Sequence, residues 1–277
     1  MIEVKNVTKT YGKKHSTFTA LDDISFTVPD GASVAIIGKS GSGKSTLMHA
    51  MSGLDRPEKG QVIIDGVDIL KLKNKAVDRF RSEKIGFIFQ AFFVQANETC
   101  YDNVALPLEI AKVPARSRKM LIEEALNIVE LGDKLKQKAR NLSGGQKQRL
   151  GIARAIVNKP SIIFADEPTG NLDSTTGEKV EDLLFGLNKQ GGSTLIIVTH
   201  DIELAEKCDI QIYIKDGKID RMVGAEESSE ESQPAEAVVV DEVEEPVEPG
   251  PQDSREDSVH LEGITEIKVG ESREDKE

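Results

Sequence analysis

The fold of this chain is decided by one stretch, Gly38-Lys39-Ser40-Gly41-Ser42-Gly43-Lys44-Ser45-Thr46. It fits the pattern G-x-x-x-x-G-K-[S/T] of a phosphate-binding loop. Glycines let the backbone curl so that successive N–H groups point inward and surround a polyphosphate. The Lys44 ammonium suits the terminal phosphates, and the Ser45 hydroxyl can ligate Mg²⁺. The stretch therefore predicts a site for a nucleoside triphosphate.

The residues on either side of the loop match this interpretation. Residues 33–37 form an apolar run that is typical of a buried parallel strand. After the loop, apolar residues from Leu47 to Leu54 follow a helical period, and Gly53 is a C-terminal stop signal. The predicted order is strand, glycine loop and helix, with the helix N-terminus directed at an anion. The alternative, an ordinary Gly/Ser-rich turn, does not explain these flanks.

Charge is distributed unevenly along the 277 residues, whose net charge is −12. Residues 225–277 hold 19 acidic and 4 basic side chains, a net of −15, which leaves +3 for residues 1–224. This near-neutral body does not resemble a basic nucleic-acid-binding surface, so no nucleic-acid partner is expected. The acidic segment is rich in Glu, Ser, Pro and Val and predicts a disordered tail. Sparse apolar residues between Val259 and Val269 leave open a short partner-binding segment.

The cysteines and the apolar segments bear on the cellular compartment. Cys100 and Cys208 are the two cysteines, too few for a disulfide framework, which fits a reducing compartment. No segment approaches the ~20 apolar residues that cross a bilayer. The first residues lack the charged and apolar regions of a signal peptide. We therefore expect a soluble cytosolic protein without direct membrane insertion, which reaches a membrane only through a partner.

The segment before the loop predicts short strands separated by turns. The expected strands are residues 2–7, 18–21, 24–28 and 34–37, with turns at Tyr11-Gly12 and Pro29-Asp30-Gly31. Tyr11 is then placed in a loop. It is either a half-buried turn aromatic or a platform for a flat base, and its position alone does not decide between the two.

Three later strands are predicted to end in polar residues. The apolar runs 85–89, 161–165 and 195–199 are followed by Gln90, by Asp166 and Glu167, and by His200. Ligands of open α/β sheets bind at the carboxyl ends of the strands. One of the two adjacent acids can hold Mg²⁺ while the other faces an attacking water, because side chains alternate along a strand. Gln90 can equally be an ordinary strand terminator, and His200 an ordinary surface histidine.

Residues 91–158 change to helical periodicity. Helices are predicted over residues 103–110 and 117–131, with Pro107 and Pro114 as punctuation. A third helix is predicted to begin at Ser143, a good N-cap, with Gly144 and Gly145 in its first turn. Two glycines at this point are explained either by the close approach of an anion to the backbone or by a flexible helix start.

In this order, the motifs resemble the ATP-binding subunit of an ABC transporter over about residues 1–223. The most specific of them is the signature Leu142-Ser143-Gly144-Gly145-Gln146, which other phosphate-loop ATPases lack. The resemblance implies an α/β phosphate-loop NTPase core, a mostly parallel sheet flanked by helices. It also implies an N-terminal antiparallel β subdomain and a helical subdomain at about residues 91–158. The ATP-binding domain is then expected at residues 1–224, and the acidic tail at residues 225–277.

The resemblance also implies a role for each matching residue. The expected ligand is ATP with Mg²⁺, with Tyr11 stacked on adenine and residues 38–46 around the phosphates. The residues expected at Mg²⁺ are Ser45, Gln90 and Asp166. Those expected to act in hydrolysis are Glu167, as the general base, and His200, in contact with the γ-phosphate, together with Gln90 and Lys44. ATP bound to a second copy, arranged head to tail, would be reached by Ser143, Gly144, Gly145 and Gln146, with Asp173 at the dimer seam.

The partners that the resemblance implies are a second copy of the chain and an integral membrane permease, at the cytoplasmic face of the cell membrane. The branch that serves lipoprotein release, macrolide efflux and antimicrobial-peptide resistance is resembled at residues 54–57, 86–90, 103–108 and 165–173. The chain departs from that branch at residues 94–99, where the membrane partner is expected, so the sequence does not fix the cargo. Two other classes stay open. One is a regulator of cell-wall enzymes like the cell-division ABC ATPase, and the other is a soluble ABC ATPase.

Overall fold

The computed structural model describes residues 1–13 and 16–224. By its contacts the chain divides into two units, Met1–Ser228 and Ser229–Glu277. The predicted acidic tail, with its apolar residues 259–269, lies outside the described residues. The proposed domain boundary at residue 224 stays a prediction.

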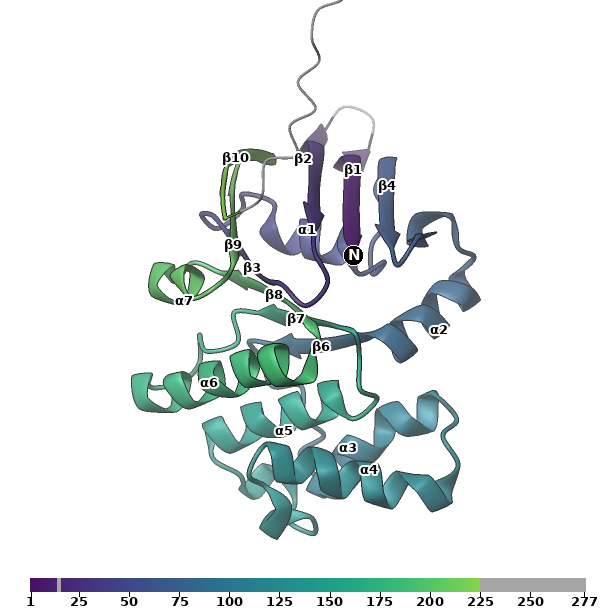
Figure 1. The fold of residues 1–277 in the computed structure, drawn as a ribbon, viewed down its shortest axis with the longest axis vertical. Coiled ribbons are helices and arrows are strands. Elements are labelled where there is room, and N and C mark those ends of the chain that lie inside the picture. The colour runs from purple at the N-terminus through teal and green to yellow at the C-terminus, as the bar shows by residue number, and fades with distance from the viewer. Residues whose placement is uncertain (14–15, 225–277) are drawn as a thin grey trace, which may run out of the picture. The chain divides into compact units, whose positions relative to one another are not determined.

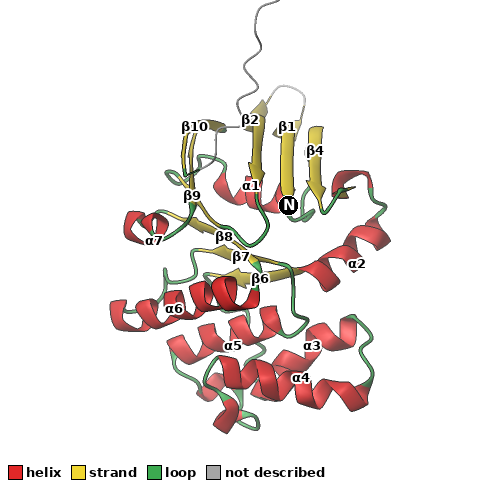
Figure 2. Cartoon of the chain, in the orientation of Figure 1, coloured by secondary structure: helices red, strands yellow, loops and turns green. Residues whose placement is uncertain are grey.

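The strands of the described part form two sheets (Figure 2). The six-stranded sheet has the order β10-β9-β3-β8-β7-β6, and all of its neighbours pair in parallel except β10 with β9. The four-stranded sheet has the order β2-β1-β4-β5 and is antiparallel. The bounds are β1 Ile2–Lys13, β2 Ser16–Val28, β3 Ser33–Ile37, β4 Lys59–Ile64, β5 Val67–Asp68, β6 Ile85–Phe89, β7 Ile162–Asp166, β8 Thr194–Thr199, β9 Ile210–Lys215 and β10 Lys218–Val223.

Helices fill the connections between these strands. The α-helices are α1 Lys44–Met51, α2 Asn74–Lys84, α3 Cys100–Ile110, α4 Ala115–Ile128, α5 Gly144–Ile156, α6 Ser174–Gly191 and α7 Ile202–Glu206. Short 3₁₀ turns are η1 Ile69–Lys71, η2 Gly132–Lys134 and η3 Ala139–Asn141. Within the described residues, no helix combines the length and the apolar content needed to cross a bilayer.

The central strands of the six-stranded sheet, β3, β7 and β8, are buried on both faces, as the apolar runs predict. All five residues of β3 are buried, and they alternate between two cores. Val34 and Ile36 pack with α1 and the four-stranded sheet, whereas Ala35 and Ile37 pack with helices α3 to α7. Figure 1 shows α5 and α6 beneath this sheet and α3 and α4 beyond them. The predicted α/β core with an antiparallel β subdomain and a helical subdomain is confirmed.

The N-terminal strands are longer than the sequence predicts. β1 continues through Tyr11 and Gly12, and β2 includes both of the runs that were expected to be separate strands. Gly12 has φ 107, and a Cβ there would lie 1.9 Å from the Ser16 carbonyl oxygen. This glycine therefore marks a close approach of two paired strands, and the expected turn at Tyr11-Gly12 is wrong. The break within β2 comes from a bulge, because Asp23 has φ 56 and the pairing with β1 shifts register around it.

Pro107 lies inside α3, as the predicted helix over residues 103–110 implies, and α3 begins earlier, at Cys100. The helix continues because the Pro107 carbonyl still accepts a hydrogen bond from Ala111 N–H at 2.9 Å. Proline removes one helical hydrogen bond, and burial of Val104 and Leu108 on either side offsets this loss. Pro114 does act as a boundary, since it is the N-cap of α4.

Candidate nucleotide-binding site

A cavity of about 750 Å³ lies at the carboxyl ends of β3, β7 and β8. It is walled by the glycine loop, the polar strand ends and the hairpin of β1 and β2. The lining residues are Tyr11, Phe18, Ala20, Lys39, Ser40, Gly41, Gly43, Lys44, Ser45, Thr46, Gln90, Asp166, Glu167, Val198 and His200. The polar strand ends meet in the cavity because the parallel strands all end at this edge, and the antiparallel strands β1 and β2 add Tyr11, Phe18 and Ala20.

The glycine loop enters α1 without a side-chain cap. Gly43 is the N-cap of α1, with φ 109 and no side-chain hydrogen bond to the first turn. The free N–H groups of this turn therefore face the cavity, as an anion site requires. A Cβ on Gly43 would lie 2.5 Å from the Ala20 carbonyl oxygen, and only glycine fits there. Lys44 Nζ donates to the carbonyl oxygens of Gly38 at 2.7 Å and Lys39 at 3.0 Å, which places its charge along the loop.

Two predicted loop residues shape the loop from behind and do not line the cavity. A Cβ on Gly38 would lie 2.4 Å from the Ile214 carbonyl oxygen, so the loop is pressed against β9. Ser42 is 7% exposed, and its carbonyl accepts a hydrogen bond from Gly217 N–H at 3.0 Å. The Ser42 hydroxyl is buried and has no hydrogen-bond partner among the described residues. Contacts with the β9–β10 hairpin thus fix the back of the loop.

The two adjacent acids leave β7 in different directions, for a reason beyond strand alternation. Asp166 is the last residue of β7, and Glu167 has φ 47, in the left-handed region. Such a conformation costs about 1–3 kcal/mol. It is held by a hydrogen bond from Glu167 N–H to the Val198 carbonyl at 2.9 Å. Glu167 Oε1 then lies 2.8 Å from His200 Nδ1, so the sheet edge joins two predicted site residues.

The residues predicted for Mg²⁺ lie together in this cavity. Ser45, Gln90 and Asp166 all line it. Burial raises the pKa of Asp166, and the charge of Glu167 raises it further. A divalent cation would relieve both effects, because it favours the ionised carboxylate. No cluster of three or more His, Cys, Asp or Glu residues suited to a metal occurs in the described ranges. Mg²⁺ needs none, since it is often held by one or two carboxylates with water and substrate phosphates.

An aromatic pair forms the other end of the cavity. Tyr11 of β1 and Phe18 of β2 are directly paired across the strands, so their side chains share one face. They are 41% and 61% exposed, respectively. Phe18 was not predicted as a site residue, because its pairing with Tyr11 follows only from the register of the long hairpin. Phe18 is therefore a second aromatic side chain at the end of the cavity where Tyr11 is expected to contact the base.

The signature residues do not line this cavity. Ser143 caps α5 in a capping box: its hydroxyl accepts from Gln146 N–H at 3.3 Å, and Gln146 Oε1 accepts from Ser143 N–H at 3.0 Å. Ser143 and Gly144 are exposed. A Cβ on Gly145 would lie 2.2 Å from Thr176 Cγ2, whereas one on Gly144 would make ordinary contacts of 3.8 Å or more. Gly145 is thus required by packing on α6, and packing within the chain does not require Gly144.

A buried glutamine that was not predicted as a site residue ties α5 to two cavity loops. Gln148 is 1% exposed. Its Nε2 donates to the Pro168 carbonyl at 2.6 Å and to the Phe89 carbonyl at 3.3 Å. These carbonyls adjoin Glu167 and Gln90. A polar residue four positions before the buried Ile152 was the available sequence signal.

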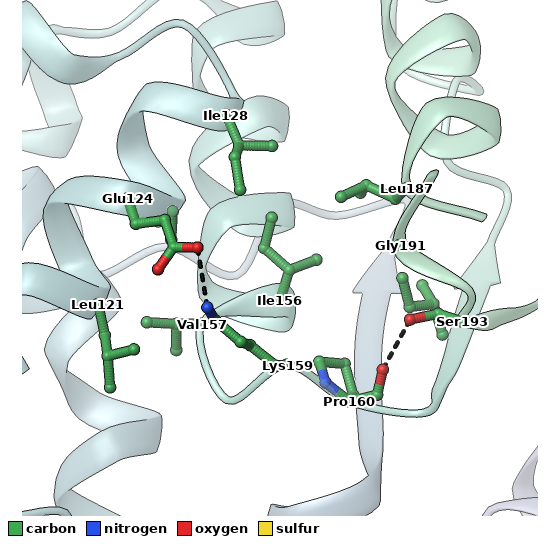
Figure 3. Close-up of a pocket in the computed structure, with 12 residues that line it drawn as sticks. Leu121, Glu124, Ile128, Ile156, Val157, Lys159, Pro160, Leu187, Gly191 and Ser193 are labelled. Carbon is green, nitrogen blue, oxygen red and sulfur yellow. Dashed lines mark hydrogen bonds and ion pairs between the residues drawn. The ribbon is translucent and has the colours of Figure 1, made fainter. Parts of the chain in front are cut away.

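A second cavity, of about 220 Å³, is lined by residues of α4, the end of α5 and the end of α6 (Figure 3). Its walls are mainly apolar, and an ion pair joins Lys159 Nζ to Glu124 Oε1 at 2.8 Å. The Ser193 hydroxyl donates to the Pro160 carbonyl at 2.7 Å, so this polar group is also satisfied. The small cavity offers no converging donors for a polyphosphate, whereas the 750 Å³ cavity is lined by the glycine loop and by Lys44.

The fold and the site together define a phosphate-loop nucleotide-binding protein. A strand, the glycine loop and an uncapped helix are followed by acidic and polar strand ends around one cavity. This combination is suited to holding a triphosphate and activating a water for attack on it.

Comparison with known proteins gives the family. The family described as ABC transporter matches residues 21–170. An uncharacterized ABC transporter ATP-binding protein of Thermotoga maritima is 44% identical over 220 residues, which cover 79% of this chain and 94% of that protein. The lipoprotein-releasing system ATP-binding protein LolD of Syntrophus aciditrophicus is 41% identical, covering 79% of this chain and 98% of LolD. The chain belongs to the ABC transporter family, as an ATP-binding subunit that hydrolyses ATP.

Solved structures agree with this assignment. The ATP-binding cassette MJ0796 of Methanocaldococcus jannaschii has been solved as a dimer in a post-hydrolysis state bound to ADP and Pi. That structure is 41% identical to this chain, with a TM-score of 0.74, and the match covers 80% of this chain and 98% of the other. The predicted resemblance to an ABC ATP-binding subunit is confirmed, and relatives named for lipoprotein release are among the matches.

Proposed function

We propose that this subunit hydrolyses Mg²⁺-ATP in composite sites between two copies of the chain, arranged head to tail, and so drives a separate membrane permease. One observation carries the proposal. The signature residues Ser143 to Gln146 are absent from the lining of the loop's cavity, and Ser143 and Gly144 are exposed. A site completed by the α5 N-terminus of a second copy accounts for both facts. The dimeric MJ0796 structures support this arrangement.

On this proposal the loop holds the phosphates. The α1 N-terminus and Lys44 bind the β- and γ-phosphates. Ser45, Gln90 and Asp166 hold Mg²⁺, which would stabilise charge on the phosphate oxygens. Tyr11 stacks on adenine, with Phe18 as a second aromatic contact at the same end of the cavity.

Glu167 acts as the general base on the attacking water, and His200 contacts the γ-phosphate beside it. The 2.8 Å contact between His200 Nδ1 and Glu167 Oε1 supports the pairing of these roles. The left-handed backbone of Glu167 directs its carboxylate away from Asp166, so base and metal ligand are separated. Positioned general bases contribute about 10²–10⁴-fold to rates. Asp173 lies at the dimer seam as the exposed N-cap of α6, beside the region where Gly145 packs on Thr176.

The surface proposed for the permease is a groove of about 610 Å³ along the edge strand β6. Its walls come from α2, β6, α3 and α5, and Ile110 and Pro107 give it an apolar rim. Arg154 also lines the groove, and its guanidinium donates to the Phe93 carbonyl at 2.7 Å. β6 leads directly from this groove to Gln90 in the nucleotide cavity. A partner helix that docks here could therefore shift Gln90 through β6, and a movement of Gln90 could in turn reach the partner helix.

The permease would place the subunit at the cytoplasmic face of the cell membrane. LolD-type relatives support a partner of the class that serves lipoprotein release, by export or by transmission of force. Residues 94–99 depart from that branch and directly follow Phe93, whose carbonyl accepts a hydrogen bond from the groove residue Arg154, so they are the expected determinants of partner choice.

Replacing Glu167 by Gln tests the catalytic part of the proposal. Glu167→Gln keeps the size and the contact to His200 but cannot accept a proton. We expect ATP turnover to fall by about 10²-fold or more, while ATP still binds and an ATP-dependent dimer accumulates on size-exclusion chromatography with light scattering. Glu203→Gln, the same change in an exposed residue of α7, is the control and should behave as wild type. Near-normal turnover of Glu167→Gln would refute the assignment of the base.

A further inference from the structure

Behind the Tyr11 ring lies a buried lysine that no predicted role uses. Lys9 is 7% exposed, although most lysines lie at the surface. Its Nζ donates to Asp55 Oδ1 at 2.8 Å and to the Arg56 carbonyl at 2.7 Å. The ammonium also stands over the Tyr11 ring, 5.1 Å from its centroid, within the range of a cation–π interaction. Lys9 therefore covers one face of this ring.

Asp55 connects the lysine to the tyrosine. Its second oxygen, Oδ2, accepts a hydrogen bond from the Tyr11 hydroxyl at 2.7 Å. Burial alone would raise the pKa of Asp55, but hydrogen bonds from Lys9 and Tyr11 outweigh it and lower that pKa. Partial burial and the Asp55 carboxylate raise the pKa of Tyr11, so the phenol stays protonated and remains a donor. The ring is thus held at its hydroxyl and on one face.

Asp55 is in turn fixed to the helix that carries the phosphate loop. The His49 carbonyl accepts from Leu54 N–H at 2.9 Å and from Asp55 N–H at 3.1 Å, which ends α1. Eight residues of α-helix span about 12 Å. One end of α1 therefore faces the phosphates, and the other end sets the position of the aromatic ring.

We propose that Lys9 and Asp55 are positioning residues that hold the Tyr11 ring in register with the phosphate loop, so that a nucleobase stacks on its open face. This inference rests on the proposed function, in which Tyr11 contacts the base. The Tyr11 hydroxyl is already engaged by Asp55, so the ring recognises the flat face of a base and not its hydrogen-bonding edge. Stacking of this kind is tolerant of base identity.

The test compares ATP with inorganic tripolyphosphate, which has no base. Steady-state ATPase assays on the full chain give kcat and KM for ATP, and the inhibition constant of tripolyphosphate. We expect Tyr11→Phe and Asp55→Ala each to raise KM for ATP roughly three- to tenfold, with kcat changed less than about twofold. The tripolyphosphate inhibition constant should not change. The double variant should be no worse than Asp55→Ala, because both changes remove the same hydrogen bond.

Conservative and control variants keep the result interpretable. Lys9→Arg should leave KM for ATP close to the wild-type value, whereas Lys9→Met should raise KM for ATP as Asp55→Ala does. Because Lys9 is buried and its variants can unfold, Tyr11→Phe is the decisive change, since it removes only a hydroxyl. The proposal is overturned if Tyr11→Phe leaves KM for ATP unchanged, or if the tripolyphosphate inhibition constant rises in parallel with KM.

Failure of this proposal is distinguishable from failure of the proposed function. If Tyr11→Ala leaves KM for ATP unchanged, base stacking on Tyr11 is wrong, and the positioning role falls with it. If Tyr11→Ala raises KM but Tyr11→Phe and Asp55→Ala do not, the ring contacts the base and the positioning role alone is refuted. Activity that survives in Glu167→Gln would affect only the catalytic assignment, because KM for ATP would still report the base contact.

Discussion

Gly144 and Gly145 are adjacent in the signature, and the structure gives them different reasons for being glycine. A Cβ on Gly145 would lie 2.2 Å from Thr176 Cγ2, far inside the usual carbon–carbon contact of about 3.5–4.0 Å. On Gly144 it would lie 3.8 Å from Phe92 Cζ, an ordinary contact. Both residues have helical backbone, so alanine introduces no strain of φ at either position.

These contacts set the sign of two stability changes. Replacing a helical Gly by Ala gains about 0.5–1 kcal/mol, and overpacking costs about 1–3 kcal/mol. Gly144→Ala should therefore leave the free energy of unfolding unchanged or raise it by up to about 1 kcal/mol. Gly145→Ala should lower it by roughly 1–2 kcal/mol, and Thr176→Ser, which removes Cγ2, should relieve most of that loss in the double variant.

Urea unfolding of the nucleotide-free chain measures both changes, since the slope with denaturant stays constant and only the midpoint moves. Equal destabilisation by both alanines, or a Gly145→Ala variant as stable as wild type, would refute the packing argument. The functional consequence is separate. If Gly144 serves the second copy, Gly144→Ala keeps its stability but loses ATP-dependent dimerisation and turnover, whereas full activity would argue against the composite site.

Three further outcomes are expected. Gln148→Leu leaves the carbonyls of Pro168 and Phe89 without their buried donor, which should cost about 1–3 kcal/mol of stability in urea unfolding. The control is Gln61→Leu, at a half-buried residue of β4. Equal losses of stability in the two variants would contradict a special role for Gln148. Burial raises the pKa of Cys208 to about 12 and also raises that of Cys100, so neither thiol should react with a thiol reagent at neutral pH until guanidinium chloride unfolds the chain; rapid labelling of native protein would contradict this. Hydrogen bonds from Ser33 lower the pKa of Asp209, so Asp209 stabilises the fold above its unfolded pKa of about 3.9, and this contribution disappears as the pH falls through the lower folded value. Asp209→Asn should therefore flatten the loss of stability between neutral and acidic pH, measured by thermal unfolding, and an unchanged pH profile would count against it.

Much of the fold followed from patterns that are local. The strands β6 and β8 begin or end within a residue of their predicted bounds, because continuous apolar runs flanked by polar residues identify buried strands. The N-terminal hairpin was less accessible to prediction. The alternation of buried and exposed residues in this hairpin is interrupted by a register shift around Asp23 and by the positive φ of Gly12. Both features depend on contacts with the partner strand.

The candidate site divides in the same way. Strand ends placed Gln90, Asp166 and His200 at one edge by a rule of sheet topology. Phe18 and Gln148 could not be recognised, because each matters only through a neighbour distant in sequence. Phe18 is paired with Tyr11 by the hairpin register, and Gln148 reaches carbonyls 59 and 20 residues away.

By itself the sequence determined the chemistry of residues 38–46, because strand, loop and helix are contiguous and each glycine acts on its own backbone. It also determined the α/β class, since apolar periodicity is a local signal. Only the tertiary structure decided which groups meet around that loop: that Lys9 and Asp55 hold Tyr11, that Glu167 turns toward His200, and that the signature does not line the cavity. These are long-range contacts, set by the pairing of strands and the packing of helices, and no window of sequence contains both partners.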